Sequence, residues 1–217
     1  MKRRDFSALI ATTPFAGAAL AQGGPVEGRQ YLALATPQPT TPGKIDVIEF
    51  FWYGCPHCYA FEPIIEGWAK QQAADVAYRK VHVAFRANVK IHQRMFFALE
   101  AMGKEAAARP AIFAAIHQRG MGLDDVKSQA QFLSSIGIDG AKYTEAYNSF
   151  GVQNKCTQAE KMQDAYRIDG VPMVAIGGRF LTSPGQVGGG QRLSEDELGR
   201  RAVSVMDFLV NRVRTKA

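Results

Sequence analysis

Two cysteines two residues apart, Cys55 and Cys58, follow an apolar run in the segment EFFWYGCPHCYAFEP. The residues from Lys44 to Phe51 are mostly β-branched or aromatic, which predicts a strand that is buried on both faces. Pro56 suits the first position of a helix, and apolar residues recur with helical spacing from Tyr59 to Trp68. We therefore expect the two cysteines at a turn from a central strand into a helix.

The order of the remaining elements indicates an α/β fold with an insertion. A second strand is expected from Ala77 to Phe85, which completes a strand–helix–strand unit. Strand character then returns only at Met173 to Ile176, where Gly177-Gly178 predicts a hairpin turn. From Cys58 to Pro172 there are 114 residues, although a helix, a strand and a crossover need only about 40. The surplus shows helical periodicity, so we expect an all-helical domain inserted at 86–151, within an α/β domain at 22–85 and 152–217.

Smaller features complete this picture. Tyr31 to Leu34 is expected as an edge strand, and Thr182 to Gln191 as a Gly-rich loop. Ser194 and Glu197 form a capping box that starts a closing helix ending near Arg214. Apolar positions define the faces of the inserted helices, and the last of these faces is expected to contain Tyr143, Ala146, Tyr147 and Phe150.

The N-terminus resembles an export signal. Lys2, Arg3 and Arg4 precede an uncharged run, and residues 19–21 (Ala-Leu-Ala) provide a small-x-small cleavage pattern. The run is too short to span a bilayer, so we expect residues 1–21 to be cleaved. The Arg3-Arg4 pair leaves open whether export follows the general or the twin-arginine route.

Charge gives no sign of a nucleic-acid partner. The net charge of the chain is +6, and removal of the signal takes away three cations and one anion, which leaves +4. No block of lysine and arginine follows, so we expect no nucleic-acid binding.

Three functions are open to the cysteine pair. A zinc site takes four Cys or His ligands, and the sequence offers no second pair, so we expect no metal. A structural disulfide across so small a loop would stabilise little. The third possibility is a redox-active dithiol at a strand-to-helix turn, which an exported protein with only three cysteines favours.

The predicted position of the pair assigns different roles to its two sulfurs. Cys55 begins the helix, where free N–H groups and the helix dipole stabilise a thiolate and lower its pKa. His57 can add a hydrogen bond or a positive charge. Because the thiolate exists only in the reduced protein, its stabilisation makes the disulfide more oxidising, and about 30 mV corresponds to a tenfold change in the equilibrium constant. Cys58 should be more buried and act as the resolving thiol.

Glu49 is a carboxylate within the apolar strand, and burial of an unpaired carboxylate is costly. Lys80, in the neighbouring strand, is the candidate partner. Such a pair can relay protons for Cys58, or Glu49 can simply reach solvent at the end of its strand.

Two segments are candidates for substrate contact. Val171-Pro172 precedes a strand, and a cis bond there would expose the Val171 backbone to a substrate strand. Trp52 either forms an apolar docking surface beside the cysteines or is simply packed. Cys156 lies in a helical stretch, where we expect a packed or partly exposed free thiol.

The chain resembles the DsbA family of bacterial periplasmic thiol:disulfide oxidoreductases. The segments IEFFWYGCPHCYAFEP, KVHVAF, YNSF and GVPMVAIGGRF occur in the family's order and at compatible spacing. The resemblance implies a thioredoxin fold with an inserted helical domain. It implies that Cys55 exchanges, Cys58 resolves, His57 tunes the pair beside Pro56, Pro172 is cis, and Glu49 with Lys80 is the family's buried charged pair.

The resemblance also implies a function. A monomeric periplasmic protein without a cofactor would donate its disulfide to newly exported proteins that contain cysteines. A DsbB-type, quinone-linked inner-membrane partner would then reoxidise it. An isomerase, a thioredoxin-like reductant and a non-enzymatic binding module are the alternatives. The isomerases usually carry an N-terminal dimerisation domain, for which few residues are available here.

Overall fold

The computed structural model describes residues 24–215, so the predicted export signal lies outside the described residues. A five-stranded sheet forms the centre of the molecule, in the order β1-β5-β4-β2-β3. The strands are β1 (Leu32–Ala33), β2 (Ile45–Phe51), β3 (Val76–His82), β4 (Met173–Ile176) and β5 (Phe180–Thr182). Only the β2–β3 pair is parallel, as the strand–helix–strand unit requires.

Strand β2 lies inside the sheet, and all of its residues are buried. It pairs with β3 on one side and with β4 on the other, which places Glu49 opposite Lys80 and Val174. Burial on both faces accounts for the nearly continuous apolar sequence of this strand. The strand ends at Phe51, and the chain reaches the cysteines four residues later.

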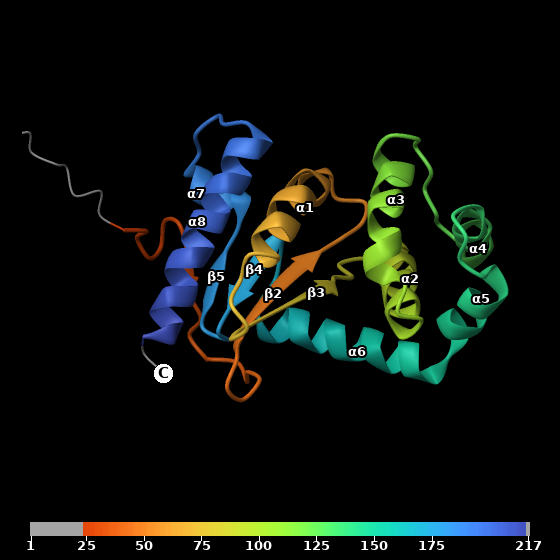
Figure 1. Ribbon diagram of the computed structural model, residues 1–217, viewed down its shortest axis with the longest axis horizontal. Coiled ribbons are helices and arrows are strands. Elements are labelled where there is room, and N and C mark those ends of the chain that lie inside the picture. The colour runs from red at the N-terminus through yellow and green to blue at the C-terminus, as the bar shows by residue number, and fades with distance from the viewer. Residues whose placement is uncertain (1–23, 216–217) are drawn as a thin grey trace, which may run out of the picture.

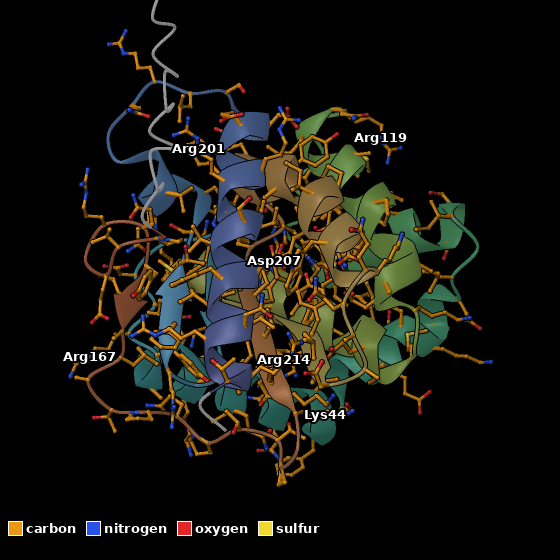
Figure 2. The ribbon with its side chains drawn as sticks, turned by 60° about the vertical axis from the view of Figure 1, so that its left-hand side comes forward. Lys44, Arg119, Arg167, Arg201, Asp207 and Arg214 are labelled. Atoms are coloured by element: carbon orange, nitrogen blue, oxygen red, sulfur yellow. The ribbon has the colours of Figure 1, made fainter. Side chains whose placement is uncertain are left out.

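Two long helices cover one face of the sheet. Helix α1 (Pro56–Ala69) and helix α8 (Glu195–Arg214) pack on this face side by side (Figures 1 and 2). Asp207 lies on α8 (Figure 2), and its Oδ1 accepts a hydrogen bond of 2.7 Å from Trp68 Nε1 of α1. This face and its helices form one apolar core, which contains Val47, Ile65 and Met206.

The opposite face of the sheet joins the core of the inserted helices. Tyr166, at the end of α6 (Phe150–Ala165), packs against Phe50 with ring centroids 5.4 Å apart. Helix α6 runs from beneath the sheet to the outer helices (Figure 1). The other inserted helices are α2 (Ala87–Ala101), α3 (Glu105–His117), α4 (Val126–Ser135) and α5 (Gly140–Asn148). The expected domain boundary after residue 151 falls within the first turn of α6.

Three details differ from the sequence expectations. Strand β3 ends at His82, because its partner β2 ends at Phe51. The expected loop at 182–191 contains a short helix, α7 (Pro184–Gly188), which forms because the Ser183 side chain caps the Gln186 N–H. Phe150 is 85% exposed, since it begins a new helix instead of continuing the apolar face of α5.

No helix in the described part of the chain is long and apolar enough to cross a membrane.

Apart from the three differences above, the strand and helix bounds agree closely with the sequence expectations, including the closing helix that starts after Ser194 and ends at Arg214. The turn between β2 and α1 is the place where the sheet and the inserted helices meet.

Candidate active site

Cys55 is the N-cap residue of α1, and Pro56 occupies the first position of the helix. The Cys55 sulfur accepts a hydrogen bond from the backbone N–H of Cys58 at 3.4 Å, in the place where a Ser or Asp oxygen caps most helices. Cys58 lies one turn into the helix and is fully buried, whereas Cys55 retains 5% of its exposure. Both cysteines are reduced.

The pKa of one thiol lies below neutral pH and the pKa of the other lies above it. The pKa of Cys55 is lowered to about 6, mainly by the hydrogen bond from the Cys58 thiol and further by the backbone N–H groups of Cys58 and His57. The charge of His57 adds to this effect, and burial opposes it. Burial raises the pKa of Cys58 well above its ordinary value. At neutral pH the pair therefore consists of one thiolate and one thiol, and the thiol donates to the thiolate.

His57 acts on Cys55 through its backbone and its charge. Its side chain is exposed, and Nδ1 lies 2.8 Å from Glu195 Oε1 at the start of α8. The sequence predicts that His57 adds either a hydrogen bond or a positive charge to Cys55. In the structure the ring makes its hydrogen bond to Glu195 and not to the Cys55 sulfur. Sequence reasoning did not identify Glu195, which is distant in the chain.

The Val171-Pro172 peptide bond is cis, as the family resemblance implied. The Cys55 sulfur lies 3.4 Å from the Val171 carbonyl oxygen. Val171 is half-buried and Pro172 is buried beside the cysteine pair. The residue before the proline thus has its backbone next to the reactive sulfur.

Glu49 and Lys80 form a buried ion pair through Lys80 Nζ and Glu49 Oε2. Glu49 is completely buried, so the alternative that it reaches solvent is wrong. The same Oε2 accepts a hydrogen bond of 2.8 Å from the Tyr78 hydroxyl, while Oε1 has no hydrogen-bond partner among the described residues. Burial is the main cause of the raised pKa of Cys58, and the negative charge of Glu49 adds a smaller contribution in the same direction.

The ion pair belongs to a larger network that sequence reasoning missed. Lys80 Nζ also lies 2.8 Å from Glu62 Oε2 of α1. Arg109 of α3 then contacts Glu62, Glu66 and Glu105. The only sequence signal was the spacing of Glu105 and Arg109 by four residues on one helix. That spacing is common on exposed faces and does not predict burial.

Trp52 and Tyr53 are held by three histidines that the sequence places on different elements. The Trp52 indole N–H donates to His92 Nδ1 at 3.1 Å. The backbone N–H of Tyr53 donates to His82 Nε2 at 3.2 Å, and His117 Nε2 donates to the Tyr53 carbonyl oxygen at 2.8 Å. Their rings therefore serve as structural contacts that hold the segment before Cys55.

The tautomers of two of these rings follow from their partners. His82 Nδ1 donates to the Val83 carbonyl oxygen, which leaves Nε2 free to accept. His92 Nε2 donates to the Gly122 carbonyl oxygen, which leaves Nδ1 to accept from Trp52. Both rings must be neutral to accept these bonds, and burial lowers the pKa of both.

The two remaining sequence questions concern Cys156 and metal binding. Cys156 lies half-buried on α6, and burial raises its pKa to about 11, so it is a thiol at neutral pH. It is the packed free cysteine that the sequence predicts. Across residues 24–215, no three His, Cys, Asp or Glu side chains are grouped so that they can hold a metal ion.

Comparisons with known proteins agree with this geometry. Residues 46–195 match the family described as DSBA-like thioredoxin domain. The chain is 39% identical to the thiol:disulfide interchange protein DsbA of Burkholderia cepacia, with 100% of this chain and 99% of the relative covered. It is 41% identical to the protein of the same name from Azotobacter vinelandii, over 87% of this chain and 84% of the relative.

A solved structure shows the same fold. The crystal structure of Pseudomonas aeruginosa DsbA is 36% identical and superimposes with a TM-score of 0.81, covering 87% of this chain and 94% of that one. The chain therefore combines the thioredoxin fold and the inserted helices with two thiols of different pKa at a helix N-terminus. It is also similar in sequence to these relatives over most of its length. The chain belongs to the DSBA-like thioredoxin domain family, and it is a thiol:disulfide oxidoreductase.

Proposed function

We propose that this protein acts in the periplasm and donates the Cys55–Cys58 disulfide to newly exported proteins that contain cysteines. The observation that carries the proposal is the opposite ionisation of the two thiols in the reduced protein. A thiolate that is stable at neutral pH favours the reduced pair, so the disulfide tends to oxidise other dithiols. The predicted export signal and the periplasmic family resemblance support the compartment.

The exchange proceeds in two steps that balance in electrons and protons. A substrate thiolate attacks the Cys55 sulfur, the Cys55–Cys58 bond breaks, and Cys58 leaves and takes up a proton. A second substrate thiolate then attacks the substrate sulfur of the mixed disulfide, and Cys55 leaves as the thiolate. Two electrons pass from the substrate to the protein. Of the two protons that the substrate thiols lose, one goes to Cys58 and the other goes to the solvent.

Glu49 is the proposed proton partner of Cys58 in this exchange. It is buried, it bears one carboxylate oxygen without a hydrogen bond among the described residues, and its charge affects the Cys58 thiol. Lys80 lies against the carboxylate as its counter-ion in an apolar strand. The pair thus provides a base where water has little access.

Val171 and Trp52 are the proposed substrate contacts. The Val171 carbonyl oxygen lies beside the reactive sulfur, so an extended substrate segment can pair with this backbone while its cysteine reaches Cys55. Trp52 is half-buried and adds apolar surface next to the pair. We expect a monomer that needs no cofactor, and reoxidation by a DsbB-type, quinone-linked membrane partner.

Equilibration with glutathione tests the proposal. The Cys55–Cys58 pair is expected to be mostly reduced at ratios of reduced to oxidised glutathione at which ordinary structural disulfides stay intact. Oxidised protein should also form a disulfide in a reduced, unfolded two-cysteine substrate, and Cys55→Ala should abolish this transfer. A strongly reducing equilibrium constant would overturn the donor assignment.

A further inference from the structure

We propose that Arg109, contributed by the inserted helices, is a positioning residue for the dithiol. In this role it holds the carboxylates that share Lys80 with Glu49, and so it controls proton exchange at Cys58. The inference rests on the proton role of Glu49 proposed above. It does not depend on which proteins are the substrates.

The contacts of Arg109 join two parts of the fold. Its Nη1 lies 3.0 Å from Glu62 Oε1 and 2.6 Å from Glu66 Oε1, both on α1. Its Nε donates to Glu105 Oε1 on its own helix at 2.8 Å. The Arg109 side chain is 9% exposed, so these are largely desolvated contacts and not surface ion pairs.

Glu62 links Arg109 to the charged pair below the cysteines. One Glu62 oxygen contacts Arg109, and the other accepts from Lys80 Nζ at 2.8 Å. Lys80 in turn contacts Glu49. An unbroken path of ion pairs therefore runs from α3 through α1 and β3 to the carboxylate of β2 that affects Cys58.

The network contains more anions than cations. Four carboxylates share the two cations Lys80 and Arg109: Glu49, Glu62, Glu66 and Glu105. Within residues 24–215, the neutral side chains that donate to these carboxylates are two hydroxyl groups, from Tyr78 to Glu49 and from Tyr53 to Glu105, each at 2.8 Å. Because buried negative charge is costly, this group of carboxylates needs both cations as counter-charges, and burial raises the pKa of Glu62.

The network also has access to solvent. An open cavity of about 430 Å³ lies between β3, α1, α2 and α3, and Glu66, Lys80, Glu105 and Arg109 are among its lining residues. Arg79 and Glu100 are the other charged residues that line this cavity. Protons can therefore enter or leave the network through this cavity.

The arrangement predicts the direction in which each substitution changes the pKa of Cys58, and this direction distinguishes an effect of charge from an effect of packing. Loss of a cation raises the pKa of the acids around it, and loss of an anion lowers it. Arg109→Met should therefore make Cys58 harder to deprotonate, and Glu105→Gln should make it easier. Arg109→Lys keeps the charge and should stay near the parent protein.

The experiment measures closure of a mixed disulfide by Cys58. The parent and every variant carry Cys156→Ser, so that the third free thiol does not react. Reduced protein is mixed with dithiodipyridine, which releases one chromophoric thione when Cys55 reacts and a second when Cys58 closes the disulfide. We expect the pH–rate curve of the second release to shift by about half a pH unit to one unit toward higher pH in Arg109→Met. At a fixed pH below the midpoint, the rate of the second release is then about three- to tenfold lower than in the parent. In Glu105→Gln the curve should shift toward lower pH.

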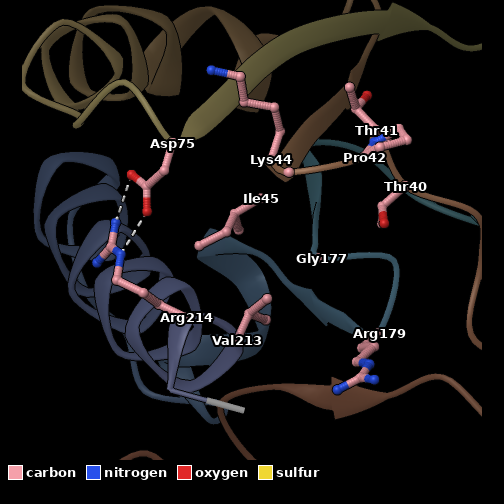
Figure 3. Close-up of a pocket in the computed structure, with 11 residues that line it drawn as sticks. Thr40, Thr41, Pro42, Lys44, Ile45, Asp75, Gly177, Arg179, Val213 and Arg214 are labelled. Atoms are coloured by element: carbon pink, nitrogen blue, oxygen red, sulfur yellow. Dashed lines mark hydrogen bonds and ion pairs between the residues drawn. The ribbon is translucent and has the colours of Figure 1, made fainter. Parts of the chain in front are cut away.

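The matched control is Arg214→Met. Arg214 pairs with Asp75 at 2.7 Å, beside a pocket at the opposite end of β2 (Figure 3). This variant also loses an arginine that pairs with a carboxylate, but outside the network, and its pH–rate curve should coincide with that of the parent.

Three results would overturn the inference. These are an unmoved curve in folded Arg109→Met, shifts of the same direction in Arg109→Met and Glu105→Gln, and an Arg109→Lys variant as impaired as Arg109→Met. Should Arg109→Met fail to fold, Glu105→Gln and Arg109→Lys still decide. Glu49→Gln separates the two proposals. If Glu49→Gln leaves the pH–rate curve unchanged, the proton role proposed for Glu49 is wrong as well as the role of Arg109. If Glu49→Gln shifts the curve and the Arg109 and Glu105 variants do not, only the role proposed for Arg109 is wrong.

Discussion

At the scale of residues, the site depends on two sulfurs that lie in one helical turn but in different surroundings. Cys55 caps the helix and receives hydrogen bonds, whereas Cys58 donates through both its backbone N–H and its thiol and is enclosed. The largest cause of the lowered Cys55 pKa is its own partner. The pair therefore creates its own asymmetry, which the helix N-terminus then increases.

The thiolate absorbance of the reduced protein tests this division. We expect Cys55 to titrate with a midpoint at about pH 6. Cys58→Ala should raise this midpoint toward the ordinary thiol value, because it removes the largest stabilising hydrogen bond while the helix stays in place. An unchanged midpoint in Cys58→Ala would show that the backbone and the helix dipole suffice.

Gly54 is a second residue whose identity matters for the site. A Cβ at this position would lie 2.4 Å from Cζ2 of the Trp52 ring. Gly54→Ala should therefore displace the ring, break its bond to His92 and destabilise the protein by about 1–3 kcal/mol. Tryptophan fluorescence and urea denaturation measure both effects.

Gly67 is the matched control for that substitution. It lies inside α1, and a Cβ there would meet no atom within 4 Å. Gly67→Ala should stabilise the protein by about 0.5–1 kcal/mol, since alanine has the higher helix propensity. Equal losses in the two variants would contradict the steric explanation for Gly54.

At the scale of elements, α1 connects the reactive turn to the rest of the fold. Its N-terminus carries the cysteines, its middle contributes Glu62 to the charge network, and its last turns pack against α8. The bond from Trp68 to Asp207 joins the two helices near the end of α1. The position of Cys55 therefore depends on a helix that is held at both ends.

Asp207→Ala tests this connection. The substitution leaves the indole N–H of Trp68 without its charged acceptor, so we expect a loss of about 1–3 kcal/mol of unfolding free energy. The pKa of Cys55 should not change, because the hydrogen bonds at the N-terminus of the helix remain. Denaturation and thiolate titration on the same sample measure the two quantities.

The sequence predicted elements better than it predicted their partners. Periodicity located β2, α1 and α8, and Glu49 was identified because a carboxylate is unusual in an apolar strand. Arg109 and the three histidines were not identified as parts of the site, since their roles depend on contacts between elements that are distant in the chain. Helix α7 was missed because its glycines suggested a loop, although Ser183 and Pro184 are favourable at a helix start.

At the scale of the whole molecule, the inserted helices and the sheet contribute to one site. His92 of α2 and His117 of α3 hold the segment before Cys55, and α3 supplies Arg109. His82 of β3 holds the same segment from the sheet. The site therefore lies in a shared core and not on the surface of either part.

The buried histidines predict a dependence of stability on pH. The pKa of His82 is lowered by burial, whereas the unfolded chain binds a proton near pH 6.5. Below that pH the unfolded state gains a proton that the folded state does not, so stability decreases by up to about 1.4 kcal/mol per pH unit. His92 should act in the same direction.

Urea denaturation of the oxidised protein at pH 7 and pH 5 measures this effect without the contribution of the Cys55 thiolate. His82→Gln should be less stable than the parent at pH 7 but lose less stability between the two values. If the variant and the parent lose the same amount, His82 is not a source of the dependence.

The histidine contacts around Trp52 and Tyr53 bear on how far the cysteine motif can be transplanted. A CPHC segment grafted onto a minimal scaffold without inserted helices would keep the helix cap and the sulfur-to-sulfur hydrogen bond. It would lose His92, His117 and Arg109, which come from the insertion. Such a chimera would contain the reactive cysteines but would lack the contacts that hold the segment before Cys55 in place. An engineered oxidase needs both.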